Sequence, residues 1–446
     1  MKLQSVIKKD HRRFWCLLGL LLLLTMVRYA LQIDIPRVVF LVVIGAIAIF
    51  GDRDEIIAMC ICCIPLHESI DFFYALVICV GVYIVKFFRQ IRLGTNLALV
   101  LLIMAWELLH CFRTQFDAVA FLASVIPFMV LTVMMASDTE NLDYALVVRA
   151  FAWATLGMIL VLFIRVLYFS DFNILRALAG LQRLGSDQHS NIQGATVSGG
   201  QVNVNSLGIV AVLASTGLMQ LRHMSQGRKS DIILMCVTLV FAALSASRTY
   251  LACLAMMIVL LIFAEKGGAA KKLRLFGLLL LAVAVAVAAL AIFFPDNLAY
   301  YISRFDDADI TTGRDRLMIA YHRFIMDNPD VMFFGIGLQN FGSRLVSVYR
   351  ISKNVPHNAV QEIIIAWGLP GLFLFAVLFF NMYRTARQHN KNLALINWIP
   401  LLLVIFKSMA GQMLTSAYTM LAFSFAYLSL CTDMSDSGIR KSQISQ

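Results

Sequence analysis

Charged residues are scarce in this sequence. Only 14% of its 446 residues are Asp, Glu, Lys or Arg, whereas 60% are hydrophobic. This balance lies far outside the usual composition of a soluble globular protein. Apolar runs long enough to cross about 30 Å of hydrocarbon as helices recur along the whole chain. We therefore predict an all-α fold, a polytopic membrane bundle of about 12–14 transmembrane helices.

The sequence also lacks the single basic patch or stripe that nucleic-acid binding requires. Its formal net charge is +11, but Lys and Arg occur in short clusters between the apolar runs. Such clusters indicate membrane topology, and we expect no nucleic-acid partner. No small-residue cleavage site follows the first apolar run, so we interpret that run as a membrane span.

Paired cysteine motifs that typify metal centres are absent. The nine cysteines lie in or beside apolar runs, and Cys60, Cys62 and Cys63 form the densest group. A structural metal site needs a closed set of ligands, and this group has no paired partner motif. We interpret the cysteines as packed or lipid-facing thiols.

Hydropathy places the spans in an order that also gives an orientation. The predicted spans lie near 14–33, 37–50, 56–66, 72–88, 96–111, 118–135, 145–168, 204–221, 231–247, 249–264, 275–294, 359–382, 394–409 and 413–431. The connections rich in Lys and Arg all fall on one side, which the positive-inside rule makes cytoplasmic. Both termini are then cytoplasmic. We predict a single transmembrane domain over 1–431, with a short cytoplasmic tail at 432–446.

Two long connections, near 170–203 and 294–358, are predicted to face outward. The second is rich in arginine, against the orientation rule, and it precedes the last three helices. We interpret it as a catalytic loop. It contains an amphipathic segment that follows Thr311-Thr312-Gly313-Arg314, with apolar residues at helical spacing at Leu317, Ala320, Tyr321, Phe324 and Ile325.

A threonine N-cap places Arg314 in the first turn of this helix, where backbone N–H groups favour an anion such as a phosphate. We expect the helix to lie along the membrane surface and to end at Asn328-Pro329. Gly335-Ile336-Gly337 is predicted to form a flexible turn. Asn354-Val355-Pro356-His357-Asn358 then leads into the next span and holds His357 at the membrane edge.

Four groups of motifs follow one another in the second half of the chain. They are Arg183-Leu184-Gly185 followed by Asn203-Val204-Asn205; Ser245-Ala246-Ser247-Arg248; Arg304-Phe305 through Thr312-Gly313-Arg314 to Gly335-Ile336-Gly337; and Pro356-His357-Asn358 with Gln361, Glu362 and Gly368-Leu369-Pro370-Gly371. In this order, and on these predicted outer loops, they resemble the O-antigen ligase and polysaccharide polymerase family of bacterial cell-surface glycan assembly.

The resemblance implies a glycosyltransferase of the bacterial inner membrane whose site faces the periplasm or exterior. Its donor is an oligosaccharide linked to undecaprenyl diphosphate, and its acceptor is a glycan or lipid-linked glycan. Neither ATP nor a metal is implied, so we expect no cofactor. The lipid bilayer is a further expected partner, and a membrane protein that regulates chain length is an open alternative.

The residues fit this chemistry independently of the resemblance. A diphosphate is a good leaving group, and fixed arginines stabilise the charge that develops on it. The predicted diphosphate-binding residues are Arg183, Arg248, Arg314 and Arg304, of which Arg248 and Arg314 are also predicted to be catalytic. The acceptor hydroxyl needs a base near neutral pH, and His357 is the candidate. Attack in one step inverts the anomeric centre.

Glu362 and Asn358 are predicted to position the acceptor. Some of these residues have structural alternatives. Arg248 lies at a tight hairpin and can extend to the lipid interface, and His357 can cap a helix or pair with another side chain. Arg183 lies in a polar loop where solvated arginine is common.

Alternative functions remain open from the sequence. Asp306-Asp307-Ala308-Asp309 contains the pattern by which many sugar-nucleotide transferases hold a divalent cation, although arginines can neutralise a diphosphate instead. We favour a polymerase of O-antigen, capsule or exopolysaccharide repeat units over a ligase that transfers finished polymer. A transporter or lipid flippase is the alternative of another class, although the inverted repeats and broken helices expected of it are not evident.

Overall fold

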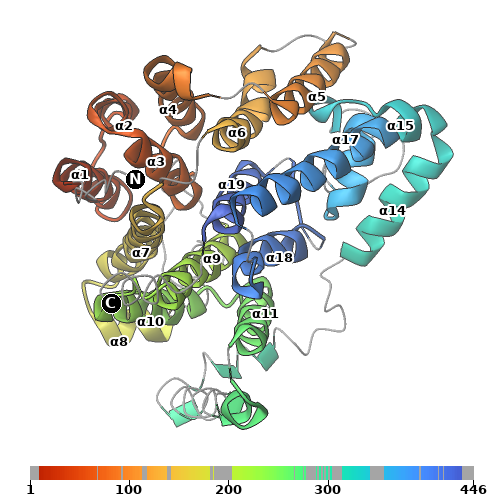
Figure 1. The fold of residues 1–446 in the computed structure, drawn as a ribbon. Helices are drawn as coiled ribbons and strands as arrows, with labels where there is room; N and C mark the ends of the chain where they lie inside the picture. The colour runs from red at the N-terminus through yellow and green to blue at the C-terminus, as the bar shows by residue number, and fades with distance from the viewer. Residues whose placement is uncertain are drawn as a thin grey trace, which may run out of the picture.

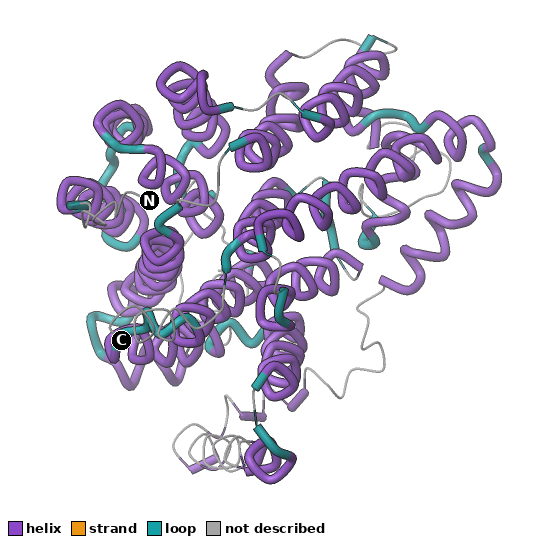
Figure 2. The backbone as a smooth tube through the Cα atoms, in the orientation of Figure 1, coloured by secondary structure: helices purple, strands orange, loops and turns teal. Residues whose placement is uncertain are grey.

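The structure of the protein is a computed structural model that describes part of the chain. The described residues are 10–67, 69–91, 94–112, 118–137, 142–180, 184, 203–265, 267–274, 276–277, 288, 291–292, 295, 298–299, 302–303, 314–341, 356–390, 393–409, 411–414 and 416–433. Within these ranges every regular element is helical, as Figures 1 and 2 show. The predicted all-α membrane fold is confirmed.

The long helices follow the predicted spans closely. They are α1 (Arg12–Tyr29), α2 (Arg37–Phe50), α3 (Arg53–Leu66), α4 (Phe72–Phe87), α5 (Thr95–Cys111), α6 (Ala118–Ala136), α7 (Tyr144–Phe169), α9 (Val204–His223), α10 (Lys229–Ala243), α11 (Arg248–Ala264), α17 (Ala359–His389), α18 (Leu395–Met409) and α19 (Ala417–Cys431). Shorter pieces are η1 (Phe88–Gln90), α8 (Ile174–Gly180), α14 (Arg314–Asp327), α15 (Pro329–Phe334) and η3 (Leu338–Asn340). Most of the predicted span 275–294 lies outside the described residues.

Length and composition allow three of the described helices to cross a membrane. These are Phe72–Gln90, Tyr144–Phe169 and Ala359–His389, and shorter apolar helices occur among the rest. Large hydrophobic side chains such as Val85, Phe263 and Phe380 are exposed on the helix surfaces. In a membrane bundle such side chains face lipid, because hydrocarbon takes the place of water around the fold.

The centre of the bundle is formed by α3, α7, α9, α18 and α19 (Figure 1). α3 packs on α7, α7 packs on α9, and α18 packs on α19. Every residue from Ile56 to Leu66 in α3 is buried, which explains why this helix is apolar all round. The thiols of Cys60, Cys62 and Cys63 are therefore packing groups, as predicted, whereas Cys16 and Cys236 are exposed on apolar helices.

The arginine-rich loop contributes the predicted amphipathic helix, α14. It begins at Arg314, and it buries Leu317, Tyr321, Phe324 and Ile325 along one side. α14 lies along the outside of α15 and α17 (Figure 1), and the Gln361 amide Nε2 donates to the Met318 carbonyl at 2.8 Å. The apolar pattern of α14 thus packs the helix against α17.

Candidate active site

Helix ends from distant parts of the sequence meet at one end of the bundle. Ser247 Oγ, at the start of α11, donates to Asn205 Oδ1 at the start of α9 over 2.6 Å. Asn358, at the start of α17, donates from Nδ2 to the Met409 carbonyl at the end of α18 over 3.2 Å. These contacts join the starts of α9 and α11 to each other and the start of α17 to the end of α18. Backbone N–H groups at helix starts favour anions, so this end of the bundle suits negative charge.

Arg248 is the first residue of α11, and local geometry fixes its position. Ser247 caps the helix because its Oγ accepts the Tyr250 N–H at 3.2 Å. Ala246 adopts the left-handed conformation, with φ of 46°, and so closes the tight turn from α10. The Leu184 N–H donates to the Leu244 carbonyl at 2.8 Å, which places Leu184 beside this turn.

Arg314 lies close to Arg248. Burial lowers the pKa of the Arg314 guanidinium below its ordinary value, and the positive charge of Arg248 lowers the pKa further. Tyr418, from the start of α19, acts on Arg314 in the opposite direction. Two neighbouring guanidinium groups repel each other, and an anion bound between them would relieve that repulsion.

Lys407 is a third cation at this end of the bundle, and the sequence analysis did not select it. It is buried near the end of α18, and its Nζ donates to the Gln412 carbonyl at 2.7 Å and to Thr419 Oγ1 at 2.6 Å. Nζ also lies 4.5 Å from the centroid of the Tyr418 ring. In the part of the chain that the structure describes, Lys407 has no carboxylate partner. A buried cation without a counter-ion is costly, which points to a functional role.

Tyr418 interacts with both Lys407 and Arg314. Its side chain interacts with Lys407, with Ser206 of α9 and with Ser416. Its ring lies 5.0 Å, between centroids, from the ring of His67 at the end of α3. We call Arg248, Arg314 and Lys407 the cationic cluster, since Tyr418 adjoins both Arg314 and Lys407.

Asn358 and Glu362 order the backbone around this cluster. Asn358 Oδ1 caps α17 by accepting the N–H groups of Val360 and Gln361 at 3.0 and 3.2 Å. Glu362 is fully buried, and its Oε2 accepts the N–H groups of Met413 and Leu414 at 2.6 and 3.0 Å. Both residues therefore hold the turn between α18 and α19. Their predicted role in positioning the acceptor stays a prediction.

His357 is half-buried immediately before the Asn358 cap, at the start of α17. The cap fixes the backbone beside it, and α17 is joined to α14 through Gln361. His357 and Arg314 thus begin two helices that pack together.

A break in α17 gives the glycine motifs a physical explanation. Gly368 has φ of 68°, and Pro370 has no N–H to donate to the carbonyl of Ala366. The N–H groups of Ile336 and Gly337 replace the missing helical donors, and they donate to the carbonyls of Ile365 and Ala366 at 2.8 Å each. A turn is present at Gly335-Ile336-Gly337 as predicted, but these hydrogen bonds hold it against α17, so the flexibility that the sequence suggested is not what the structure shows.

Glu107 of α5 completes this support. It is fully buried and accepts the Trp367 Nε1–H at 2.6 Å and the Leu338 N–H at 3.1 Å. Trp106 Nε1 donates to the Trp367 carbonyl at 3.2 Å. Consecutive residues of α5 therefore hold both the helix break and the glycine turn, and so the position of the loop helices.

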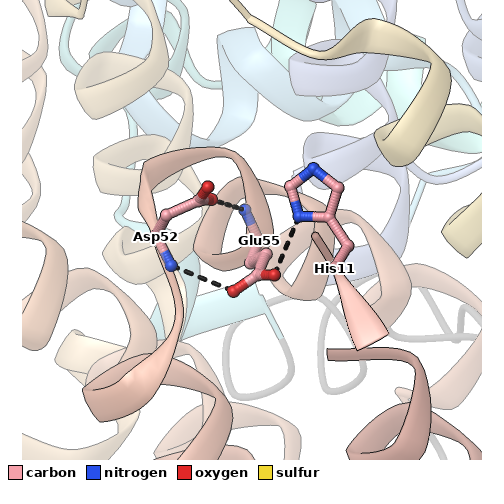
Figure 3. Close-up of side chains that lie close together, drawn as sticks. All are labelled: His11, Asp52 and Glu55. Carbon is pink, nitrogen blue, oxygen red and sulfur yellow. Dashed lines mark hydrogen bonds and ion pairs between the residues drawn. The ribbon is translucent and has the colours of Figure 1, made fainter. Parts of the chain in front are cut away.

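A second group of polar residues lies at the other end of α3 from His67. His11, Asp52 and Glu55 have potential metal-ligating atoms within 4.8 Å of one another (Figure 3). Asp52 and Glu55 form a capping box, in which each carboxylate accepts the other residue's backbone N–H at 3.0 Å. His11 Nδ1 lies 2.8 Å from Glu55 Oε1. Because the carboxylates already cap α3, we assign this group a structural role.

The structure thus brings Arg248 and Arg314 together and places His357, Asn358 and Glu362 at the adjoining helix start. Arg183 and Arg304 lie outside the described residues, as do the predicted threonine cap of α14 and Asp306-Asp307-Ala308-Asp309. Lys407 was the residue that the sequence analysis missed. The signal was present, because a lysine within an apolar span is a functional candidate by default.

Fold and site together define a polytopic helical membrane protein with buried and half-buried cations at one end. Residues 232–376, about a third of the chain, match the sequence profile of the O-antigen ligase family. This confirms the resemblance over the segment that contains Arg248, Arg314, His357 and Glu362. It supports a membrane enzyme of glycan assembly. No curated protein matches the chain.

Proposed function

We propose that this protein transfers a glycan from undecaprenyl diphosphate to a sugar hydroxyl at the outer face of the bacterial inner membrane. The observation that carries this proposal is the cationic cluster, in which Arg248 and Arg314 adjoin at helix starts beside the buried Lys407. The family match over residues 232–376 supports the same class of reaction.

The cationic cluster suits the leaving group. When the bond between the anomeric carbon and the diphosphate oxygen breaks, both electrons go to that oxygen and its negative charge grows. Fixed guanidinium and ammonium groups stabilise this charge without reorganising, and in a site of low dielectric the effect is larger than in water. The arginines and Lys407 can therefore supply the neutralisation that a divalent cation supplies in other transferases.

His357 is the proposed base. As the acceptor oxygen forms its bond to the anomeric carbon, its proton moves to the imidazole, while undecaprenyl diphosphate departs from the opposite side. Attack and departure on opposite sides invert the anomeric configuration in one step. Glu362 and Asn358 hold the surrounding backbone, and we propose that they also help to position the acceptor. Arg183 and Arg304 are proposed as further diphosphate ligands.

The preferred form of the activity is polymerisation of lipid-linked repeat units of O-antigen, capsule or exopolysaccharide. In that form donor and acceptor both carry the lipid diphosphate. Both forms release the donor's undecaprenyl diphosphate, but a ligase would leave the glycan on an acceptor other than a second lipid-linked repeat unit. A chain-length-regulating membrane protein is a fitting partner for the polymerase.

Transfer by the purified protein in nanodiscs tests the proposal. The substrate is the cognate lipid-linked repeat unit, without added nucleotide and with EDTA. A ladder of lengthened, carrier-linked glycan is the expected product. Product that forms only when a second acceptor lipid is present would favour the ligase. Movement of the substrate across the bilayer without any transfer would overturn the enzyme proposal in favour of a transporter.

A further inference from the structure

A basic groove lies between α9 and α10, at the opposite end of α10 from Arg248. Its volume is about 160 Å³. The groove has an apolar floor that includes Leu218, Met219 and Met235, and a basic rim. The rim residues are Arg222, Arg228 and Lys229, all of which are exposed.

The groove carries a net positive charge. Its one lining acid, Asp231, is already paired, because Arg149 Nη2 of α7 lies 3.0 Å from its Oδ2. The backbone N–H of Arg228 also donates to Asp231 Oδ2 at 2.8 Å. Arg222 and Lys229 form no ion pair with any described residue. Three rim cations therefore face a single, neutralised carboxylate.

Apolar side chains continue from this rim onto the exposed surface of α10. Ile232 lines the groove and is exposed, and the adjacent Ile233 is 65% exposed. A ligand that fits must bring an anionic group to the cations and an apolar chain to the isoleucine surface. A soluble anion would satisfy only the first of these requirements. Basic pockets between helices at a membrane boundary are typical binding sites for anionic headgroups.

We propose that this groove binds an anionic phospholipid, with its phosphate among Arg222, Arg228 and Lys229 and an acyl chain along Ile232 and Met235. The site is separate from the cationic cluster, since α10 runs from Lys229 at this end to the turn before Arg248 at the other. Binding of a lipid in the groove therefore does not depend on the proposed glycosyl transfer.

Lipid titration of the full chain in detergent micelles, followed by native mass spectrometry, tests this site. Phosphatidylglycerol is the anionic probe, and phosphatidylcholine is the zwitterionic reference. The groove variant combines Arg222→Gln and Lys229→Gln, which leaves the pair of Arg149 with Asp231 intact. The control variant combines Arg384→Gln and Arg387→Gln, which removes the same charge from the exposed end of α17.

The groove variant should bind phosphatidylglycerol about thirtyfold more weakly than the wild type, because each cation near a headgroup favours binding. The control should bind as the wild type does, and phosphatidylcholine should bind weakly throughout. Circular dichroism should be the same for all three proteins. Equal phosphatidylglycerol affinity in the groove variant would overturn the proposal. So would displacement of the lipid by millimolar inorganic phosphate, which would identify a site for a soluble anion.

Discussion

At the residue scale, the site depends on cations that lie away from bulk water. Lys407 is 6% exposed, and its Nζ is held by a carbonyl and a threonine hydroxyl. Neutral groups of this kind orient an ammonium without cancelling its charge. Arg314 is half-buried beside Arg248, and the two positive charges repel each other. Buried like charges of this kind cost stability, and under the proposed function that cost is offset by binding of the diphosphate.

Lys407→Met tests whether the buried charge of Lys407 serves ligand binding or stability. Methionine has a similar length and no charge, so the thermal transition of the variant should equal or exceed that of the wild type. Binding of undecaprenyl diphosphate should weaken about tenfold or more, because one charge-assisted contact is lost. Both are measured on the purified protein, by thermal unfolding and by titration. A variant that is destabilised but binds normally would show that Lys407 is structural.

His357→Ala tests the proposed base. Turnover should fall by about 10²–10⁴-fold, since general-base catalysis contributes on that order, while undecaprenyl diphosphate binding should be retained. His322→Ala is the matched control, because His322 is exposed on α14. Single-turnover transfer and ligand titration give the two quantities. Full turnover in His357→Ala would assign the proton transfer to another group.

At the element scale, the broken helix α17 determines where the loop helices lie. The carbonyls released at the break accept N–H groups of the turn after α15, and Glu107 accepts the N–H of the next residue of that turn. At both glycines a side chain would collide with backbone. A Cβ on Gly335 would lie 2.3 Å from the Ala366 carbonyl oxygen, and one on Gly368 would lie 2.4 Å from the Phe333 carbonyl oxygen.

Gly368→Ala and Gly335→Ala should each lower the free energy of unfolding by about 1–3 kcal/mol, because both positions combine positive φ with a backbone collision. Gly45→Ala is the control, since a Cβ there meets nothing within 4 Å in the middle of α2. It should leave stability unchanged or slightly higher, because alanine favours helix. Thermal or denaturant unfolding in detergent gives the comparison. Equal stability of all the variants would contradict the assigned role of the glycine turn.

The order and bounds of most helices could be predicted from the sequence, because apolar runs and the residues that begin or end a helix are local signals. The start of α14 at Arg314 and its end before Asn328-Pro329 were predicted in this way. Long-range pairing could not be. No local signal shows that Lys407 meets Tyr418, or that Glu362 binds the backbone of Met413 and Leu414. Those contacts join α17, α18 and α19, and they arise only from packing.

At the scale of the whole molecule, the two ends of the bundle differ in their chemistry. One end holds the cationic cluster, with helix starts around it. At the other end Lys86 Nζ donates to the Ile49 carbonyl at 3.0 Å, and Arg149 pairs with Asp231. The helix ends that adjoin the loops near 170–203 and 294–358 share the first end, as the predicted topology requires. Which side of the membrane that end faces stays a prediction.

Epitope insertion tests the sidedness. A tag placed between residues 190 and 191 should be accessible to antibody or protease in intact spheroplasts, because the first long loop is predicted to face outward. A tag between Gln226 and Gly227 should become accessible only after lysis. Each tagged protein must retain the wild-type thermal transition. The reverse accessibility would place the cationic cluster in the cytoplasm and remove the lipid-linked donor from its reach.

Recognition of the lipid diphosphate by the cationic cluster is the step on which the proposed function depends, and titration of the purified protein with undecaprenyl diphosphate measures it directly. Arg314→Ala should bind about ten- to a hundredfold more weakly than the wild type. Arg316→Ala, which removes an exposed arginine from the same helix, should bind as the wild type does. Equal affinity in all three proteins would contradict the assignment of the cationic cluster as the diphosphate site.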